Sequence, residues 1–343
     1  MIQTHMTAII SAPGKIAYQQ KEVPQLKANE VLIQVKFASI CGSDLHLFKG
    51  KHPSVELPSA VGHELSGDVI AIGDQVSTKK IGDRVTVEPV IACGKCHFCL
   101  RGQYHLCEEI SFHYRKGQGA FGTYFVSPEE HVFKLPDSIS YEEGVLIEPL
   151  SVALHAVHKN GIKLGDTCAV FGAGAIGLLT AMLVSKISQS KCFVVDINEF
   201  RLEMAKQSGA THAINNLKEN ALETILRETN QRGVDFAFEA VGMKITLEQA
   251  LQSLSKGGAA TVIGIFEDPH PIVPINLFIQ KEISLSGSQG YNWDFQDAIS
   301  ILASGNIHLQ PLITHRFRFE ELQKGFDLLL SPNNQAIKVL IEM

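Results

Sequence analysis

The chain has 343 residues, with 30 Lys and Arg against 36 Asp and Glu and a formal net charge of −6. This balance argues against a nucleic-acid partner and against an anionic membrane surface as a partner. Hydrophobic residues make up 45% and charged residues 19%, which is typical of a globular protein, and the length predicts two domains at roughly 150 residues each.

The first residues, MIQTHMTAIISAPGK, have no basic region and only a short apolar run before Pro13-Gly14, so we expect no signal peptide. A later uncharged run, Cys168–Val184, approaches the lower length limit of a membrane-spanning helix. Because glycines crowd its first half, we expect a buried strand followed by a buried helix. We therefore expect no membrane segment and a cytoplasmic location, where disulfides are not favoured.

The first 150 residues or so are predicted to be rich in strands. Glu30–Ser39 has apolar residues at every second position, and Glu64–Gly73 and Arg84–Pro89 are similar. Glycine and proline separate these segments closely, and no long helix is expected before about Glu142. We expect a β-rich unit, such as a partly closed barrel.

From about Val152 the pattern alternates between apolar strands and helices. TCAVF, KCFVVD, VDFAFEA and AATVIGI are expected strands, with AIGLLTAMLVSK, EFRLEMAKQSG and KITLEQALQSLSKG as helices between them. Continuously apolar strands alternating with helices predict a parallel sheet covered on both faces. After Ile283 we expect a short strand, helices near Phe295–Ala303 and Glu320–Leu330, and a last strand, AIKVLIE.

A glycine loop follows the first of these strands. Gly172, Gly174 and Gly177 fit the pattern G-x-G-x-x-G, with Ala175 and Ile176 inside it. The first glycine permits a tight turn, the second lets the backbone approach a pyrophosphate, and the third lets helix and strand pack closely. The loop therefore predicts a dinucleotide site at a helix N-terminus.

Asp196 ends the next apolar strand, where a carboxylate binds the adenosine ribose and repels a 2′-phosphate. We therefore expect NAD rather than NADP, although Arg201, five residues on, could accommodate the phosphate. Ile263, Ile265 and Ser288, which follow later strands, are further expected cofactor contacts.

Four of the seven cysteines lie in one loop, as Cys93-x2-Cys96-x2-Cys99-x7-Cys107. This set suits a closed tetrahedral zinc site, which has structural value but no open position for a substrate. An iron–sulfur cluster is the alternative, since it also takes four cysteines. A catalytic centre should therefore lie elsewhere.

Three other stretches carry potential metal ligands and acid–base groups. They are ICGSDLH with Cys41, Ser43, Asp44 and His46, then GHE with His63 and Glu64, then EPLSVALH with Glu148 and His155. A thiolate, an imidazole and a carboxylate form a plausible metal site with one position open. The spacing of these residues along the chain does not show whether they meet in the folded protein.

The stretches ICGSDLH, GHE, GDRVTVEP, the four-cysteine loop, EPLSVALHAV and GAGAIG occur in that order. They resemble the zinc-dependent medium-chain dehydrogenases, in the branch of sorbitol, butanediol and threonine dehydrogenases, over essentially the whole chain. The resemblance implies an α/β fold with a doubly wound parallel (Rossmann) sheet inserted into a β-rich, GroES-like catalytic domain. Residues 1–152 and 287–343 would form the catalytic domain, with its structural zinc loop at 93–107, and residues 153–286 the NAD-binding domain.

By this resemblance, Cys41 and His63 bind a catalytic zinc. Glu64 and Glu148 are the remaining candidate ligands, one binding directly and the other directly or through water. A second cysteine ligand has no counterpart, because the other cysteines lie on predicted sheet strands. The expected metals are thus one catalytic and one structural Zn2+.

The resemblance also implies roles for the neighbouring polar residues. Asp44 would orient the ligand imidazole. His155, on the helix face that carries Glu148, is expected to be a packed histidine, either beside the metal ligands or in the core. We expect Ser43 to take the substrate hydroxyl proton and His46 to pass it to solvent, while the nicotinamide accepts a hydride. The expected substrate is a small secondary alcohol or polyol.

The choice of alcohol is less constrained by the sequence. Where sorbitol dehydrogenases carry an Arg-Tyr pair, this chain has Gly290-Tyr291, and Leu47 and Phe48 are expected to line an apolar pocket. This favours a short diol over sorbitol, with threonine or a sugar-alcohol phosphate as alternatives. A zinc-free quinone reductase and a non-catalytic binding protein are further alternatives. The family implies a homotetramer or dimer that pairs edge strands around Ala260–Ile265.

Overall fold

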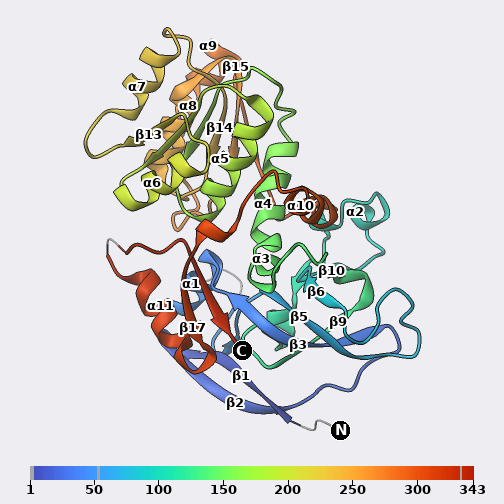
Figure 1. Ribbon diagram of the computed structural model, residues 1–343. Coiled ribbons are helices and arrows are strands. Elements are labelled where there is room, and N and C mark those ends of the chain that lie inside the picture. The colour runs from blue at the N-terminus through green and yellow to red at the C-terminus, as the bar shows by residue number, and fades with distance from the viewer. Residues whose placement is uncertain (1–3, 52–54, 333) are drawn as a thin grey trace. The chain divides into compact units, whose positions relative to one another are not determined.

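A computed structural model describes residues 4–51, 55–332 and 334–343 (Figure 1). The chain divides into two compact units, with Met1–Glu148 and Phe295–Met343 in unit 1 and Pro149–Asp294 in unit 2. Unit 2 is therefore an insertion into unit 1. The chain enters it within helix α4, Ile147–His158, and leaves it at the start of helix α10, Asp294–Ala303.

The main sheet of unit 1 has seven strands in the part of the chain that the structure describes, in the order β10-β6-β5-β3-β18-β17, with β9 also paired to β3. The strands are β3 (Glu30–Ser39), β5 (Glu64–Ile72), β6 (Arg84–Val87), β9 (Tyr124–Pro128), β10 (Val132–Lys134), β17 (Ile313–Arg318) and β18 (Lys338–Glu342). Strand β3 is central, since it pairs with β5, β9 and β18. The last strand of the chain thus lies beside one of the first.

Smaller sheets and short helices complete unit 1. The sheets are β2-β1-β4 and β7-β8, formed by β1 (Thr4–Ala12), β2 (Lys15–Glu22), β4 (Ser59–Ala60), β7 (Val90–Ile91) and β8 (Ser111–Phe112). The α-helices are α1 (Gly42–Phe48), α2 (His97–Leu100), α3 (Tyr141–Val145) and α11 (Leu322–Leu330). The 3-10 helices are η1 (Tyr104–Leu106), η2 (His113–Lys116), η3 (Glu129–His131), η4 (Gln310–Leu312) and η5 (Phe319–Glu321).

The predicted strands of unit 1 are confirmed. Strand β3 has the predicted bounds, and β5 and β6 begin where expected and end one or two residues earlier. Their alternating apolar side chains form one core with residues of α1 and α11. Leu47 and Phe48 lie in this core, where the Phe48 ring stacks on Phe326 with centroids 4.6 Å apart. They therefore give no support to the expected apolar substrate pocket.

Unit 2 is built on a six-stranded sheet in which every pairing within its described residues is parallel, in the order β13-β12-β11-β14-β15-β16. The strands are β11 (Cys168–Phe171), β12 (Cys192–Asp196), β13 (His212–Asn215), β14 (Val234–Glu239), β15 (Leu254–Val262) and β16 (Ser284–Gly287). The helices are α5 (Ala175–Ser188), α6 (Glu199–Gln207), α7 (Ala221–Glu228), α8 (Lys244–Ser253) and α9 (Asn276–Lys281). The expected doubly wound sheet is confirmed.

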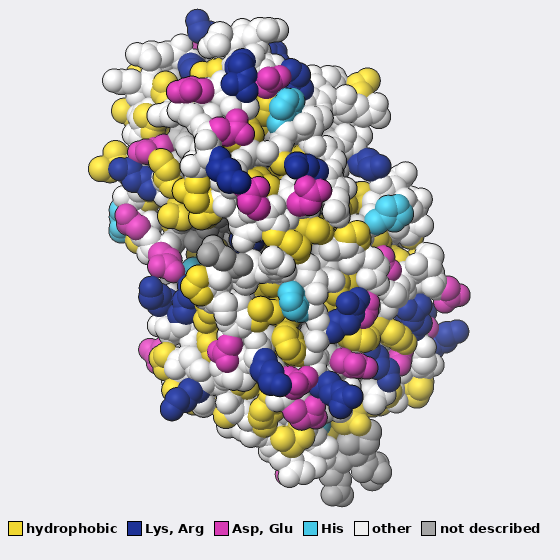
Figure 2. All heavy atoms as spheres, turned by 60° about the vertical axis from the view of Figure 1, so that its left-hand side comes forward, with side chains coloured by type: hydrophobic (Ala, Val, Ile, Leu, Met, Phe, Trp, Pro, Cys, Tyr) yellow, Lys and Arg dark blue, Asp and Glu magenta, His cyan; other side chains and the backbone are white. Residues whose placement is uncertain are grey.

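The apolar run Cys168–Val184 forms strand β11 and most of helix α5, as predicted. Cys168 and Cys192 are direct partners on neighbouring strands and are fully buried. Within the described ranges, no helix is both long enough and apolar enough to cross a bilayer. On the face shown in Figure 2, acidic and basic side chains are interspersed and do not gather in a patch of one sign.

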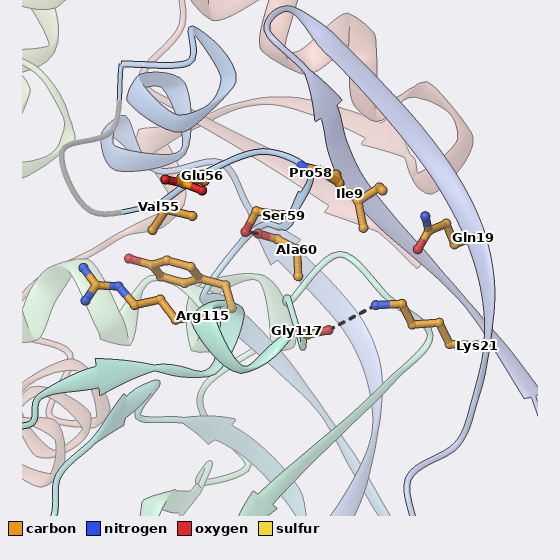
Figure 3. Close-up of a pocket in the computed structure, with 11 residues that line it drawn as sticks. Ile9, Gln19, Lys21, Val55, Glu56, Pro58, Ser59, Ala60, Arg115 and Gly117 are labelled. Carbon is orange, nitrogen blue, oxygen red and sulfur yellow. Dashed lines mark hydrogen bonds between the residues drawn. The ribbon is translucent and has the colours of Figure 1, made fainter.

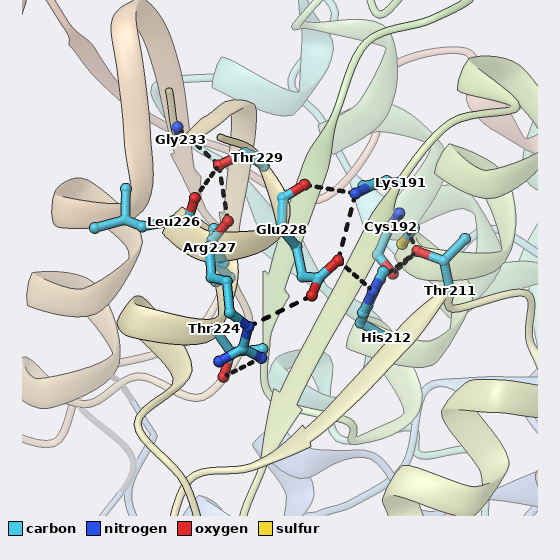
Figure 4. Close-up of polar contacts among 11 residues, drawn as sticks. Lys191, Cys192, Thr211, His212, Thr224, Leu226, Arg227, Glu228, Thr229 and Gly233 are labelled. Atoms are coloured by element: carbon cyan, nitrogen blue, oxygen red, sulfur yellow. Dashed lines mark hydrogen bonds and ion pairs between the residues drawn. The ribbon is translucent and has the colours of Figure 1, made fainter. Parts of the chain in front are cut away.

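Polar contacts attach strand β13 at one edge of this sheet (Figure 4). Glu228, at the end of α7, contacts Lys191 and His212 through one carboxylate oxygen, at 3.5 Å from each nitrogen. The His212 ring also stacks on Phe193, with centroids 4.7 Å apart. These contacts join the end of α7 to strands β12 and β13.

The opposite edge of the parallel sheet is not formed by the strand that the sequence led us to expect. Strand β15, which contains the first half of Ala260–Ile265, pairs with β14 on one side and β16 on the other, so it is not an edge strand. The edge is β16, and all four of its residues are exposed. The short strand after Ile283 was expected, but its position at the edge was not, because the order of strands in a sheet is not encoded in the local pattern.

Candidate metal centres and cofactor loop

Three ligand atoms converge in unit 1. The Cys41 thiol, a ring nitrogen of His63 and a carboxylate oxygen of Glu64 all lie within 4.8 Å of one another. Cys41 is the N-terminal cap of α1, and His63 and Glu64 stand where the chain enters β5. Cysteine, histidine and carboxylate are the ligand types that zinc takes in proteins, so the donor set fits this metal.

Asp44 holds this arrangement together. Its carboxylate accepts hydrogen bonds from the backbone N–H of Cys41 at 2.9 Å and of Gly62 at 3.2 Å. One carboxylate oxygen also lies 3.6 Å from His63 Nδ1. Because Asp44 is buried and contacts both ligand-bearing segments, it ties the start of α1 to the loop before β5. The remaining ring nitrogen, His63 Nε2, is then available to a metal.

The surroundings of His63 favour positive charge. Burial lowers the pKa of His63, but Asp44 and Cys41 raise it further than burial lowers it, so the net pKa is well above the usual value. An imidazole that is stabilised as a cation lies in a negative potential. The same potential favours a metal cation between Cys41, His63 and Glu64.

Lys338 is a member of this site that the sequence reasoning missed. The Lys338 ammonium lies 2.5 Å from both carboxylate oxygens of Glu64, and the Ser39 hydroxyl donates to one of them. Burial lowers the pKa of Lys338, but Glu64 and Cys41 outweigh it and leave the pKa above the usual value. The one feature of the sequence that could have pointed to Lys338 is the presence of a charged residue at the start of an apolar strand.

Glu148 lies outside the group of three ligand atoms among the described residues. It is buried in the first turn of α4 and is close enough to Lys338 to raise its pKa. Ser43 and His46 follow Cys41 in α1 and are half-buried. The structure thus brings Cys41, His63 and Glu64 together and leaves Glu148 farther from them.

His155 belongs to a different cluster, in unit 2. His155 Nδ1 and His158 Nδ1 lie 2.9 and 3.0 Å from the two carboxylate oxygens of Asp294. Burial raises the pKa of Asp294, but hydrogen bonds from both histidines and from the backbone N–H of Asn292 lower it well below the usual value. This contact joins α4 to the start of α10.

An aromatic wall lies beside the His63 ring. The rings of Phe112 and Tyr114 stack on each other and lie 6.3 and 6.1 Å from the His63 ring between centroids. Tyr114 also lines a cavity of about 410 Å³ in unit 1. Figure 3 shows Glu56 and Arg115 on one side of this cavity and Lys21 on the other. The cavity therefore combines apolar walls with charged groups.

The four-cysteine loop brings its ligands together as expected. The sulfur atoms of Cys93, Cys96, Cys99 and Cys107 all lie within 4.8 Å of one another, and those of Cys93 and Cys99 are 4.0 Å apart. Four thiolates at about 2.3 Å from one zinc ion would be about 3.8 Å apart. The spacing therefore favours a single metal ion over an iron–sulfur cluster.

Hydrogen bonds preorganise these sulfur atoms. The backbone N–H of Cys93 and of Glu109 donate to Cys107 Sγ at 3.2 and 3.3 Å. Backbone donors, first that of Cys99, lower the pKa of the Cys96 thiol to about 6, whereas desolvation raises that of Cys99 to about 12. A cation would stabilise all four as thiolates.

The glycine loop has the geometry of a dinucleotide cradle. Gly172 has a φ of +103°, which favours glycine, and a Cβ on Gly177 would lie 1.8 Å from the Gly172 carbonyl oxygen. A Cβ on Gly174 would meet nothing within 4 Å. Gly174 therefore faces open space at the N-terminus of α5, where a pyrophosphate can approach.

The Asp196 carboxylate is fixed at the end of β12. It accepts hydrogen bonds from the backbone N–H of Ala173 at 2.7 Å, of Ile197 at 2.7 Å and of Asn198 at 2.9 Å. Its carboxylate thus lies against the glycine loop. Arg201 follows in α6, and its buried Nε has no hydrogen-bond partner among the described residues.

The remaining predicted cofactor residues lie after the strands beyond the glycine loop. Ile263 follows β15 and donates its backbone N–H to Glu239 at 2.8 Å, and Ile265 is exposed. Ser288 follows β16, and its buried hydroxyl has no hydrogen-bond partner within the described ranges. Glu239 was not predicted; its buried carboxylate accepts the backbone N–H groups of Val241 and Gly242.

Comparison with known proteins agrees with this geometry. The family model of the alcohol dehydrogenase GroES-like domain matches residues 27–137, and that of zinc-binding dehydrogenases matches residues 175–304. The chain is 36% identical to sorbitol dehydrogenase of Bacillus subtilis, over 99% of this chain and 97% of the relative. It is 35% identical to D-xylulose reductase of Saccharomyces cerevisiae, over 99% and 98%.

A solved structure extends this similarity to the fold. The crystal structure of 2R,3R-butanediol dehydrogenase from Bacillus subtilis matches with a TM-score of 0.90 and 32% identity, over 99% of both chains. The sequence similarity, the metal-ligand group and the inserted parallel sheet all lead to one assignment. The chain belongs to the zinc-dependent medium-chain alcohol dehydrogenases, in their polyol dehydrogenase branch, and is an enzyme that acts on CH–OH donors.

Proposed function

We propose that this enzyme oxidises a short secondary alcohol or polyol to the ketone, with NAD as hydride acceptor. The observation that carries the proposal is the convergence of Cys41, His63 and Glu64 within 4.8 Å. The relatives named for sorbitol, xylulose and butanediol support this class of substrate. We assign the cofactor-binding domain to residues 153–286 and the catalytic domain to the remainder.

In the proposed reaction, Cys41, His63 and Glu64 would hold a zinc ion, which would supply the polarisation that lowers the pKa of a substrate hydroxyl. The chain's own residues then handle the proton and the geometry. Ser43 accepts the hydroxyl proton, and His46, three residues on in α1, passes it to solvent. Asp44 keeps the ligand-bearing segments in place through the contacts described above. The glycine loop would hold the nicotinamide cofactor, which would supply the acceptor for the hydride.

The preference for NAD rests on Asp196. Three backbone N–H groups hold its carboxylate beside the glycine loop. A fixed carboxylate can accept hydrogen bonds from the ribose hydroxyls and repels a 2′-phosphate. Arg201 is the residue that would favour NADP, so both cofactors belong in the same assay.

The preference for a short diol rests on two separate observations, one in each unit. Phe112 and Tyr114 supply an aromatic wall beside His63. In this chain Gly290 stands where sorbitol dehydrogenases carry an arginine, and Tyr291 is buried. A wall with few charged donors suits a substrate with few hydroxyls.

The proposal is tested by zinc analysis and a substrate screen. We expect zinc in both sites and NAD reduction with 2,3-butanediol above that with sorbitol, xylitol or threonine, with NADP run in parallel. Cys41→Ser and His63→Ala should lose the catalytic zinc and the turnover while keeping the zinc of the four-cysteine loop. Normal turnover in both variants would overturn the proposed catalytic site.

We also propose a homo-oligomer that forms through strand β16. Its exposed backbone edge and exposed Leu285 support pairing with a second copy. Leu285→Lys should lower the mass measured by light scattering, and an unchanged mass would contradict this interface. The cytoplasmic location expected from the sequence stays a prediction.

A further inference from the structure

We propose that Lys338 is a positioning residue that limits how strongly Glu64 can bind the catalytic metal. The inference rests on the proposed function, because it concerns the same metal site. It starts from one unusual observation, a lysine side chain that is buried to 2% exposure against a carboxylate that is fully buried. A buried ion pair is retained at a considerable desolvation cost, so it calls for a functional explanation.

The backbone holds the three partners in register. Ser39 on β3 is the direct partner of Glu64 on β5 and of Leu340 on β18. Lys338 lies two residues before Leu340 on β18, so it projects from the same face of the sheet. Neighbouring strands of one sheet therefore fix Glu64, Ser39 and Lys338 relative to one another.

The hydrogen bonds leave Glu64 little capacity for a metal. Lys338 contacts both carboxylate oxygens, and Ser39 donates to Oε2. A carboxylate offers about four lone-pair positions, so these contacts occupy roughly three of them. The position that remains belongs to Oε1. Glu64 can therefore offer a metal a single oxygen, whose electron density is already shared with an ammonium.

The charged groups at the metal site support the same role for Lys338. A divalent ion at this site would face Glu64 and the Cys41 thiolate, with Asp44 and Glu148 buried nearby. Lys338 is the cation that faces this group, since Glu64, Cys41 and Glu148 all act on its ammonium. Without Lys338, Glu64 would become a stronger ligand with more lone pairs and uncompensated charge. Lys338 thus keeps the third donor weak and exchangeable.

Zinc release measures this effect without any substrate. The full chain, loaded with zinc, is mixed with a chromogenic chelator, and the catalytic-site phase is identified as the one missing in Cys41→Ser. Lys338→Met should keep zinc in both sites and slow this phase by about tenfold, the effect typical of changing a partner of a metal ligand. Lys338→Arg should release zinc at the wild-type rate. Release from Lys338→Met that is unchanged or faster would overturn the inference.

Two further measurements test the inference, and the first of them does not depend on the folding of Lys338→Met. Glu64→Gln keeps Lys338 and should retain the catalytic zinc. The rate of zinc release should rise by less than roughly tenfold over the wild type. Complete loss of that zinc would make Glu64 an obligatory ligand and overturn the inference. With cobalt in the catalytic site, the visible spectrum should change in Lys338→Met and persist in Lys338→Arg, whereas a purely structural lysine predicts no difference between them.

The inference and the proposed function fail in different ways. If Cys41→Ser retains zinc in both sites, the proposed catalytic metal site is wrong. If Cys41→Ser loses one zinc as expected but Lys338→Met and Lys338→Arg release zinc alike, the site stands and only the role of Lys338 is wrong.

Discussion

The glycine loop gives a matched pair of substitutions that separate cofactor binding from folding. In Gly174→Ala the added Cβ has nothing within 4 Å, and the backbone φ of −72° suits alanine. The fold should lose no more than about 1 kcal/mol, because alanine is a poorer N-terminal cap than glycine. The methyl group should instead occupy the space through which a pyrophosphate reaches the N-terminus of α5.

In Gly177→Ala the same methyl group lies 1.8 Å from the Gly172 carbonyl oxygen, so α5 must move away from the loop. Overpacking of this kind costs about 1–3 kcal/mol, and the short distance places this case at the upper end. At roughly 2–4 °C per kcal/mol for a domain of about 150 residues, the size of unit 2, the unfolding midpoint of that unit should fall by about 6–12 °C.

Thermal unfolding without cofactor tests the expected stability of each variant, and NADH titration by fluorescence tests its affinity for the cofactor. Gly174→Ala should unfold near the wild-type temperature and bind NADH at least roughly tenfold more weakly, since steric exclusion from a site costs more than 1.4 kcal/mol. Wild-type NADH affinity in Gly174→Ala would refute the reasoning. It would mean that the second glycine does not face the cofactor.

Other substitutions test the remaining parts of the two units. Cys99→Ser should lose one zinc by atomic emission and unfold earlier, while the zinc lost in Cys41→Ser is retained; selective loss of turnover with both zinc ions in place would contradict a structural loop. Asp196→Asn should raise the NADP-linked rate relative to the NAD-linked rate by about tenfold or more, since bonds to a charged group contribute about 1.5–3 kcal/mol; an unchanged ratio would remove Asp196 from cofactor selection. Asp294→Asn should destabilise the fold at pH 7 by about 1–3 kcal/mol. Because the pKa of Asp294 is depressed in the folded state, its stabilisation is present above the ordinary value of 3.8 and is lost as the pH falls below it. The difference in unfolding temperature between wild type and Asp294→Asn should therefore be smaller at pH 3 than at pH 7. An equal difference at both pH values would show that the stabilisation does not come from the charge of Asp294.

Features encoded by neighbouring residues could be predicted from the sequence. The alternation in Glu30–Ser39 gave the bounds of β3, and the glycine spacing identified the turn between β11 and α5. Both depend on local backbone geometry, which a short stretch of residues determines. The four-cysteine loop was recognised for the same reason, since its ligands lie within one short segment.

Contacts between distant segments could not be predicted in this way. Lys338 reaches Glu64 across 274 positions of the chain, and Asp294 reaches His155 across 139. Periodicity reveals that a residue faces the core, but it does not reveal which strand will lie beside it. The edge position of β16 depends in the same way on the order of strands in the sheet.

The pairing of β3 with β18 has a consequence for how the protein is made. Unit 2 is one continuous stretch of chain, so it can fold as soon as it has left the ribosome. Unit 1 must wait, because the strand that completes its sheet beside β3 is Lys338–Glu342, which is synthesised only after the whole of unit 2. Pairing across so long a separation is slow to form. The nascent chain therefore leaves Phe37–Ser39 of β3 unpaired on one side, and Glu64 without its lysine, until this strand has been made. A variant that lacks the strand would leave that edge open to aggregation.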